Sequence, residues 1–311
     1  MNQNKEITVG SDFSGVGAFI QALLRLKIKF KERFACDMDK YARQTYLENY
    51  DEPDDFPMNV YDREIPKDPL DIYMTSPPCQ AFSLAGNRLG EDDERGILFY
   101  NSHEFIKKNK PRFFIFENVK GLLSDDKKNP KDDIGRTFRR WLDYLSGKSV
   151  NGNPVLFPHE ESVPYHIYYE VMNAKEHGVP QNRERVFIVG IRDDEDNFFR
   201  FPKTVTLEKK LIDILEEQVD AKYFLSKTAI ERLLRHNTNK DIMEKDNPEA
   251  SSTIIAGYYK SPRDVQYIKV GVENTKVEVS KEVRSKEAKE ERKKTGSNSF
   301  RGKELEFRES D

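Results

Sequence analysis

The chain has 311 residues, of which 52 are basic and 55 acidic, giving a formal net charge of -3. This balance excludes a histone-like or tail-type nucleic-acid binder, so a nucleic-acid site would have to be a local basic patch. Two cysteines, Cys36 and Cys79, exclude a disulfide framework and a CxxC metal site, and they fit reduced thiols. No apolar run reaches the roughly 18 residues of a membrane span, and residues 1–6 lack the apolar core of a signal peptide. We therefore expect a cytoplasmic protein without a metal.

The first predicted unit is a strand at residues 7–9, a glycine-containing turn at residues 11–17 and an amphipathic helix. This is the cofactor-binding arrangement of doubly wound α/β folds. A second strand, residues 33–36, ends at Asp37, where an acidic side chain about 20 residues after the glycines fits ribose recognition. The glycine pattern alone is weak, and it would also fit a nicotinamide-dependent oxidoreductase. Cys36 is interpreted as a small core residue at a strand end.

A short third strand is predicted at residues 56–60, and a buried strand follows at residues 70–74. Pro77 and Pro78 end the latter because proline cannot donate to a strand ladder. Cys79 therefore lies just past the carboxyl end of a strand, where open α/β sheets place their ligands and chemistry. An inert buried cysteine is the alternative, since such cysteines are common.

A continuous apolar strand at residues 111–116 is expected at the centre of a parallel sheet. Its carboxyl end carries Glu117, followed by Asn118 and Val119. Partial desolvation of a carboxyl group at that place favours the protonated form, which could donate to a base. A surface position for Glu117 is the alternative. A helix with one apolar face follows, at residues 138–145, and we assign it to the core.

Two further strands are predicted at residues 165–172 and 186–190. Gln181, Arg183 and Arg185 come before the second of them. With a strand period of two, these three side chains would share one face. Two guanidinium groups on one face would suit a phosphate and a base carbonyl.

Pro-Cys-Gln after one strand, Glu-Asn-Val at the end of another and Gln-x-Arg-x-Arg before a third resemble the ordered motifs of the cytosine-C5 DNA methyltransferase family. The resemblance covers roughly residues 12–192. It implies a doubly wound, mostly parallel α/β sheet of the Rossmann-like S-adenosylmethionine-dependent type. The catalytic and cofactor-binding domain would be residues 1–195. A connection and a partial target-recognition region would occupy residues 196–311.

The resemblance also implies the chemistry. The Cys79 thiolate would add to C6 of a flipped cytosine in double-stranded DNA, and C5 would take a methyl group from S-adenosylmethionine. Glu117 would support N3, Arg185 would polarise O2, and Arg183 would hold the backbone of the flipped nucleotide. A role in a restriction–modification system is implied in the same way.

The remaining site residues implied by the resemblance fall into two groups. Asp37 replaces the family's usual glutamate, and Asn59 replaces an aspartate that contacts the adenine amino group. The expected cofactor contacts are Asp12, Phe13, Gly15, Gly17, Asp37, Met38, Asn59, Pro78 and Leu98. The expected substrate contacts are Gln80, Ser83, Asn118, Val119 and Gln181.

Three alternatives stay open at this point. One is a tRNA cytosine-C5 methyltransferase of the same family, and another is a non-catalytic nucleic-acid-binding subunit. The third concerns completeness, because the family's C-terminal Gly-Asn-Ser-Val segment is matched only superficially at residues 296–299. We therefore expect a truncated or split enzyme, with a second polypeptide as a partner that supplies the C-terminal part.

Overall fold

The computed structural model describes residues 6–78, 97–127, 129, 131–195, 198–216, 242–244, 249–253 and 267–269. Three predicted site residues, Cys79, Gln80 and Ser83, lie outside the described residues. The segment at residues 296–299 also lies outside them.

The chain divides into two compact units. The first contains residues 1–173 and 184–203, and the second contains residues 174–183 and 204–311. The division that we predicted, at residue 195, is a functional one and stays a prediction.

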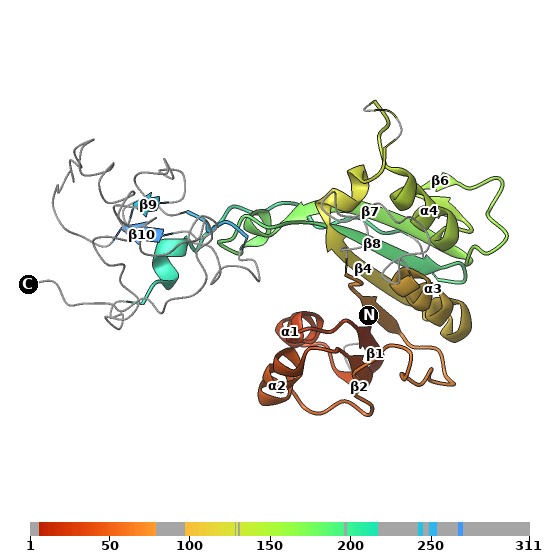
Figure 1. Cartoon of the computed structure of the whole chain (residues 1–311), viewed down its shortest axis with the longest axis horizontal. Helices are drawn as coiled ribbons and strands as arrows, with labels where there is room; N and C mark the ends of the chain where they lie inside the picture. The colour runs from red at the N-terminus through yellow and green to blue at the C-terminus, as the bar shows by residue number, and fades with distance from the viewer. Residues whose placement is uncertain are drawn as a thin grey trace, which may run out of the picture. The chain divides into compact units, whose positions relative to one another are not determined.

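The first unit is built on an eight-stranded sheet (Figure 1). The strands in spatial order are β2 (Phe30–Cys36), β1 (Ile7–Asp12), β3 (Ile72–Thr75), β4 (Phe113–Val119), β8 (Glu184–Arg192), β7 (Tyr165–Asn173), β5 (Ser149–Val150) and β6 (Asn153–Pro154). The first four run parallel, and β8 runs antiparallel to both of its neighbours. The predicted doubly wound, mostly parallel α/β sheet is confirmed.

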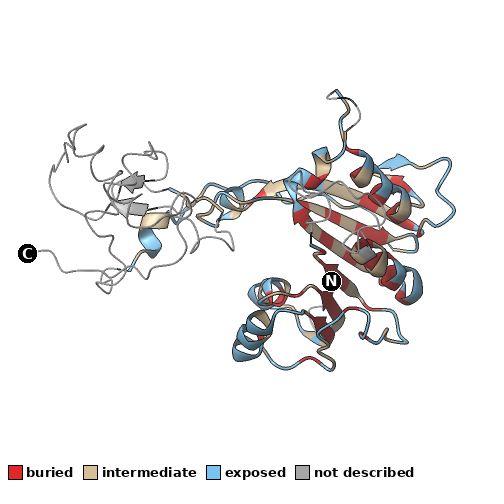
Figure 2. Cartoon of the chain, in the orientation of Figure 1, coloured by how far each residue is buried: buried red, intermediate tan, exposed pale blue. Residues whose placement is uncertain are grey.

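Helices cover both faces of this sheet, as its alternating burial requires. On one face, α1 (Ala18–Arg25) and α2 (Lys40–Asn49) pack in a core with Val9, Ala35 and Met74. On the other face, α3 (Ile97–Asn109) and α4 (Arg136–Leu145) pack in a larger, aromatic core with Phe34, Tyr73, Phe114 and Phe116. Figure 2 shows the buried residues concentrated on the strands and on the inner sides of these helices.

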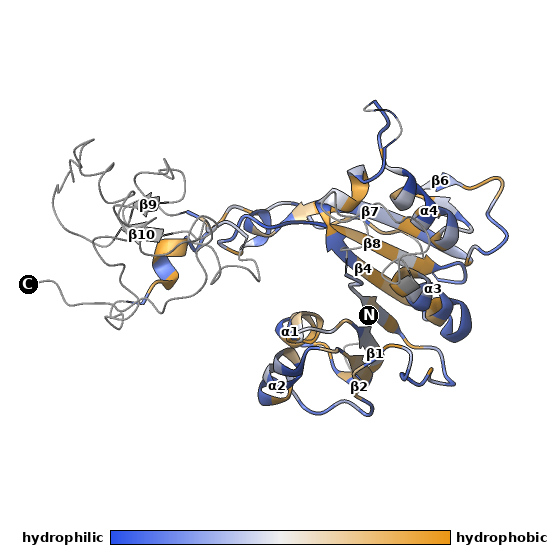
Figure 3. Ribbon diagram, in the orientation of Figure 1, coloured by the Kyte–Doolittle hydropathy of each residue, from blue (hydrophilic) through white to orange (hydrophobic). Residues whose placement is uncertain are grey.

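The predicted apolar helix face is confirmed in α4, where Phe138, Trp141, Leu142 and Leu145 are buried. The Trp141 ring stacks on Phe99 of α3, with ring centroids 4.2 Å apart. Burial of each such side chain contributes roughly 1.5–3 kcal/mol. Figure 3 shows hydrophobic colour along β4 and β8 as well.

Two expectations about strands are wrong. Residues 56–60 form turns and bends, not a strand. Only Asp54 and Asp55 make backbone hydrogen bonds with β2, because the prolines at 53 and 57 have no N–H to extend the pairing. In addition, β8 begins at Glu184. The strand-period argument therefore applies to Arg185 and not to Gln181 or Arg183, which belong to the second unit.

The described part of the second unit consists of short elements. They are the 3₁₀ helices η4 (Ala174–His177) and η5 (Leu211–Ile214) and the parallel pair β9 (Ile242–Glu244) and β10 (Tyr267–Lys269). Gln181 forms a bridge with Ser251. A further 3₁₀ helix, η3 (Lys120–Ser124), follows β4 in the first unit. Among the described residues, none of the helices has the length and apolar character needed to cross a bilayer.

Candidate active site

The turn after β1 is a left-handed backbone held by β2. Phe13, Gly15 and Gly17 have φ values of 55°, 56° and 87°. The N–H of Ser14 donates to the carbonyl of Cys36 at 2.9 Å, and the N–H of Gly15 donates to Oδ2 of Asp37 at 2.8 Å. The acidic residue predicted to bind ribose therefore also braces the glycine turn.

The two glycines of this turn serve different purposes. A Cβ placed on Gly17 would lie 2.2 Å from the Tyr50 ring, so this glycine allows α2 to pack closely. A Cβ placed on Gly15 would meet nothing within 4 Å. The backbone at Gly15 thus faces open space at the carboxyl end of β1, which fits the close approach of a bound cofactor.

Asp12, a predicted cofactor contact, is instead fully buried within the protein. Its Oδ1 accepts from Nε of Arg63 at 2.9 Å, and its Oδ2 accepts from the Tyr73 hydroxyl at 2.6 Å. Burial raises the pKa of Asp12, while the Arg63 charge and the Tyr73 hydroxyl oppose that shift. Sequence reasoning missed both partners. Arg63 lies in an irregular polar segment with no pattern that marks it as buried.

The other predicted cofactor residues differ in exposure. Met38 is 81% exposed directly after Asp37, and Leu98 in the first turn of α3 is half-buried. Asn59 is exposed, but its Oδ1 accepts from the N–H of Tyr61 at 3.1 Å, so part of its acceptor capacity is used within its own turn. Pro78 is exposed at the end of the described segment.

The segment that leads to Cys79 is fixed by two hydrogen bonds. The Ser76 hydroxyl donates to the carbonyl of Phe13 at 3.1 Å, which joins this segment to the glycine turn. Nδ2 of Asn118 donates to the carbonyl of Pro77 at 3.0 Å, and the Asn118 side chain is buried. Residues 76–78, the segment before Cys79 that is called the Cys79 stem below, are thus attached both to the turn after β1 and to the end of β4.

Glu117 and Arg185 meet across the β4–β8 pair. Nε of Arg185 lies 3.0 Å from Oε1 of Glu117, and these side chains are 17% and 23% exposed. Val119, opposite Arg185 in the register, is 37% exposed. Two of the predicted catalytic side chains are therefore together at the strand end next to the Cys79 stem, whereas Gln181 and Arg183 belong to the other unit.

Cys36 is not suited to act as the nucleophile. It is 1% exposed, and burial raises the pKa of its thiol to about 12. A thiol in this environment stays protonated and unreactive. Cys36 is a core residue, as predicted.

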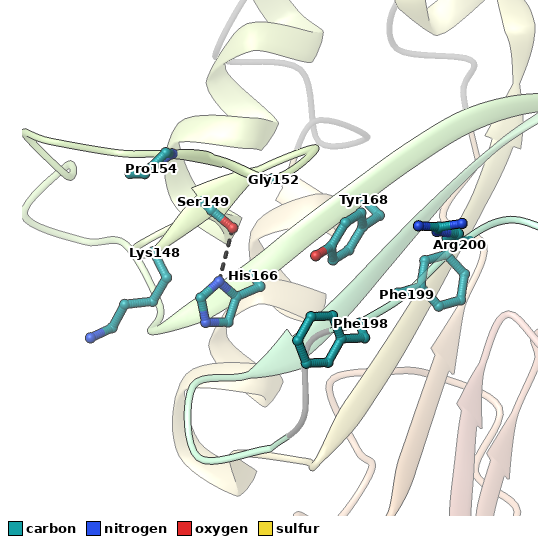
Figure 4. Close-up of a pocket in the computed structure, with 9 residues that line it drawn as sticks. All are labelled: Lys148, Ser149, Gly152, Pro154, His166, Tyr168, Phe198, Phe199 and Arg200. Carbon is teal, nitrogen blue, oxygen red and sulfur yellow. Dashed lines mark hydrogen bonds between the residues drawn. The ribbon is translucent and has the colours of Figure 1, made fainter.

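A cavity of about 620 Å³ lies at the other end of the strands, between the β5–β7 edge and residues 198–200 (Figure 4). His166 and Tyr168 line it, with Nδ1 of His166 2.8 Å from the Ser149 hydroxyl. None of the predicted site residues lines this cavity. In the described part of the chain, groups of three or more His, Cys, Asp or Glu that could bind a metal are absent.

A doubly wound sheet with a braced glycine turn after β1 and an acidic residue after β2 defines a Rossmann-like fold. Solved structures share this fold: the Entamoeba histolytica methyltransferase EhMeth (TM-score 0.62, 18% identity, 89% of this chain and 79% of that one) and a Spodoptera frugiperda DNMT2 mutant (TM-score 0.60, 20% identity, 94% and 81%). The chain belongs to the C-5 cytosine-specific DNA methylase family, whose model matches residues 7–310.

The chain is also similar to family members of bacterial and phage origin. It is 35% identical to the type II methyltransferase M.SsoII of Shigella sonnei over 244 residues, covering 75% of this chain and 58% of that protein. It is 35% identical to M.HpaII of Haemophilus parainfluenzae over 242 residues (76% and 60%). It is 30% identical to the orphan methyltransferase M.SPRI of Bacillus phage SPR over 272 residues (77% and 56%). The chain thus spans little more than half the length of these relatives.

Proposed function

We propose that the chain acts as a DNA (cytosine-5)-methyltransferase of a restriction–modification system, with S-adenosylmethionine as methyl donor and double-stranded DNA as substrate. The observation that carries the proposal is the convergence of three elements at one sheet end. Ser76 bonds the Cys79 stem to the glycine turn, Asn118 bonds it to β4, and β4 presents Glu117. The DNA substrate is supported by the family to which the chain belongs and by the names of its relatives.

The glycine turn, Asp37 and Met38 are the residues that would hold S-adenosylmethionine, which supplies an electrophilic methyl group when bound. Backbone N–H groups at the start of α1 favour its carboxylate, because the amino end of a helix carries partial positive charge. The Asp37 carboxylate retains acceptor capacity for ribose hydroxyls beyond its bonds to Gly15 and Asp39.

In the proposed reaction, the Cys79 thiolate forms a bond to C6 of a flipped cytosine, and the ring electrons move toward N3 and O2. Glu117 supplies a proton at N3, and Arg185 stabilises charge at O2. C5 then accepts the methyl group, and N3 returns its proton to the Glu117 carboxylate. Loss of the C5 proton expels the thiolate and restores the aromatic ring. Flipping is required because C6 is stacked within the duplex.

Trapping tests the nucleophile. DNA with 5-fluorocytosine at the target lacks the removable C5 proton, so a covalent adduct should accumulate at Cys79 and be found there by peptide mass spectrometry. Cys79→Ser should form no adduct but still bind cofactor. The matched control is Cys36→Ala, which removes the other thiol and should leave the adduct in place. An active enzyme that forms no adduct would reject the thiol mechanism.

The nearest alternative is a tRNA cytosine methyltransferase with the same fold. Methyl transfer from labelled S-adenosylmethionine to duplex DNA and to tRNA, measured side by side, decides between them. Label in tRNA alone would overturn the DNA assignment, and label in neither, with saturable DNA binding, would favour a non-catalytic subunit.

A second polypeptide as a partner is proposed as well. The relatives contain further sequence that this chain does not match. Activity should rise when a polypeptide with the C-terminal family segments is added. Efficient sequence-specific methylation by residues 1–311 alone would contradict this proposal.

A further inference from the structure

Arg63 is a buried cation that joins three parts of the first unit. The residue is 7% exposed, and its side chain bonds Asp12 at the end of β1 through Nε at 2.9 Å. Its Nη2 donates to Oδ1 of Asn101 in α3 at 2.8 Å. The guanidinium carbon lies 4.4 Å from the centroid of the Phe105 ring. A charge in such apolar surroundings is tolerated only when it is paired and hydrogen-bonded.

The Asp12 carboxylate is likewise fully engaged in hydrogen bonds within the protein. Its two carboxylate oxygens are occupied by Arg63 and by Tyr73 of β3, and none of its surface is exposed. The side chain therefore has no path to a bound cofactor. Its effect must pass through the backbone, by fixing the last residue of β1.

The backbone that follows Asp12 is the glycine turn. Phe13 and Gly15 both have positive φ, and Phe13 accepts from Ser76 through its carbonyl. A non-glycine residue in the left-handed region is strained, so the surrounding contacts must hold it there. The Asp12 bonds are the last fixed point before this strained residue.

Arg63 also connects the end of β1 to α3. Asn101 accepts from Arg63, and its neighbour Ser102 lies 3.0 Å from the hydroxyl of Thr75 at the end of β3. The start of α3 is thus held against the ends of both β1 and β3. Arg63 can make both bonds at once because its guanidinium presents several donors in a rigid plane.

We propose that Arg63 is a positioning residue for the cofactor site. It holds the end of β1 against α3 and so keeps the backbone of the glycine turn in the geometry that accepts S-adenosylmethionine. This inference rests on the cofactor assignment of the proposed function. It concerns neither a contact with the cofactor nor a step of the chemistry.

The test measures binding of S-adenosylhomocysteine to the full chain by calorimetry, below the unfolding temperature of each variant. Arg63→Met should raise the Kd about 10- to 100-fold, the range expected when a site is displaced by an ångström. The KM for S-adenosylmethionine should rise likewise, with a smaller change in kcat. Arg63→Lys keeps the charge without the planar fork and should recover only part of the affinity.

The matched control is Arg112→Met. Arg112 also bridges two carboxylates, with 2.7 Å to Asp71 and 2.6 Å to Glu195, but it lies at the opposite end of the strands. The Arg112→Met variant should be less stable than wild type, but its Kd for S-adenosylhomocysteine should stay within about twofold of the wild-type value, since Arg112 bonds none of the predicted site residues. Trp141 fluorescence reports folding of each variant, because this tryptophan is the only one in the chain and is 4% exposed in the aromatic core.

The outcomes separate the two claims. Wild-type protein that does not bind S-adenosylhomocysteine would reject the cofactor assignment and, with it, the role of Arg63. Wild-type binding with an unchanged Kd in folded Arg63→Met, or an equal loss in Arg112→Met, would reject the role of Arg63 alone. Should Arg63→Met not fold, Arg63→Lys and Tyr73→Phe serve for the same comparison, and an unchanged Kd in both would overturn the inference.

Discussion

The Arg185 guanidinium lies 3.0 Å from the Glu117 carboxylate, with Nε facing Oε1 across the β4–β8 pair. The two oppositely charged side chains form an ion pair, and both are partly buried. A change at one therefore removes a charge partner of the other, and their proposed roles at N3 and O2 of a cytosine are physically coupled.

The first prediction concerns this pair. Glu117→Gln keeps an acceptor but cannot supply a proton as a carboxylic acid does, so kcat should fall roughly 10²–10⁴-fold. Arg185→Met should also reduce kcat strongly. The double variant should lose less than the sum of the two free energies, because the groups act together. Single-turnover methylation of duplex DNA measures all three.

The control is the neighbouring ion pair between Lys120, at the start of η3, and Glu184, at the start of β8. Nζ of Lys120 lies 2.8 Å from Oε1 of Glu184, but these side chains are 56% and 45% exposed. Lys120→Met and Glu184→Gln should change kcat less than about threefold, since exposed pairs contribute little. Additive losses in the first pair, or a comparable loss in the control pair, would contradict coupling at the active site.

The second prediction concerns Asn118. Asn118→Ala removes the donor to the Pro77 carbonyl and leaves that group buried, so kcat should fall by up to about 10²-fold through displacement of the Cys79 stem. Cofactor affinity should change little. The matched control is Asn109→Ala. Asn109 is also buried and bonds residues 66, 68 and 70 before β3, at the far end of the strands. Both variants should lose about 1–3 kcal/mol of stability, but only Asn118→Ala should lose kcat.

The sequence predicted the sheet and most of its strands, because apolar runs bounded by proline and glycine are typical of a parallel α/β fold. It also predicted that Glu117 and Arg185 would lie at a strand end. It could not predict Arg63, since a single arginine in a polar segment has no periodicity that indicates burial. Nor could it predict that β8 begins after Arg183, because alternation alone does not define where pairing starts.

The third prediction separates the two glycines of the cofactor turn. Gly15→Ala introduces strain at a φ of 56° with no steric contact, so stability should fall by roughly 1–2 kcal/mol. The loss of binding free energy for the cofactor should exceed this loss of stability, because the new methyl group occupies the open side of the turn. Gly17→Ala should mainly lower stability, since its Cβ would overlap the Tyr50 ring at a φ of 87°. Binding and unfolding measured on both variants check this, and a larger loss of affinity in Gly17→Ala would contradict it.

The last prediction is a pH dependence that originates at Glu32, away from the site. Burial raises the pKa of Glu32 from 4.5 to about 7, although the Tyr46 hydroxyl, 2.7 Å away, opposes the shift. The folded state therefore binds more protons than the unfolded state between these two values. The resulting stability is present below pH 4.5 and is lost as the pH rises toward 7 and above. Glu32→Gln keeps a neutral acceptor for Tyr46 and removes this titration. It should be more stable than wild type at pH 8 by about 1–3 kcal/mol, and the difference should shrink toward pH 5. Urea unfolding followed by Trp141 fluorescence at pH 5, 6, 7 and 8 measures the difference, from which the contributions of all other groups cancel. A difference that is constant with pH would show that Glu32 titrates alike in both states.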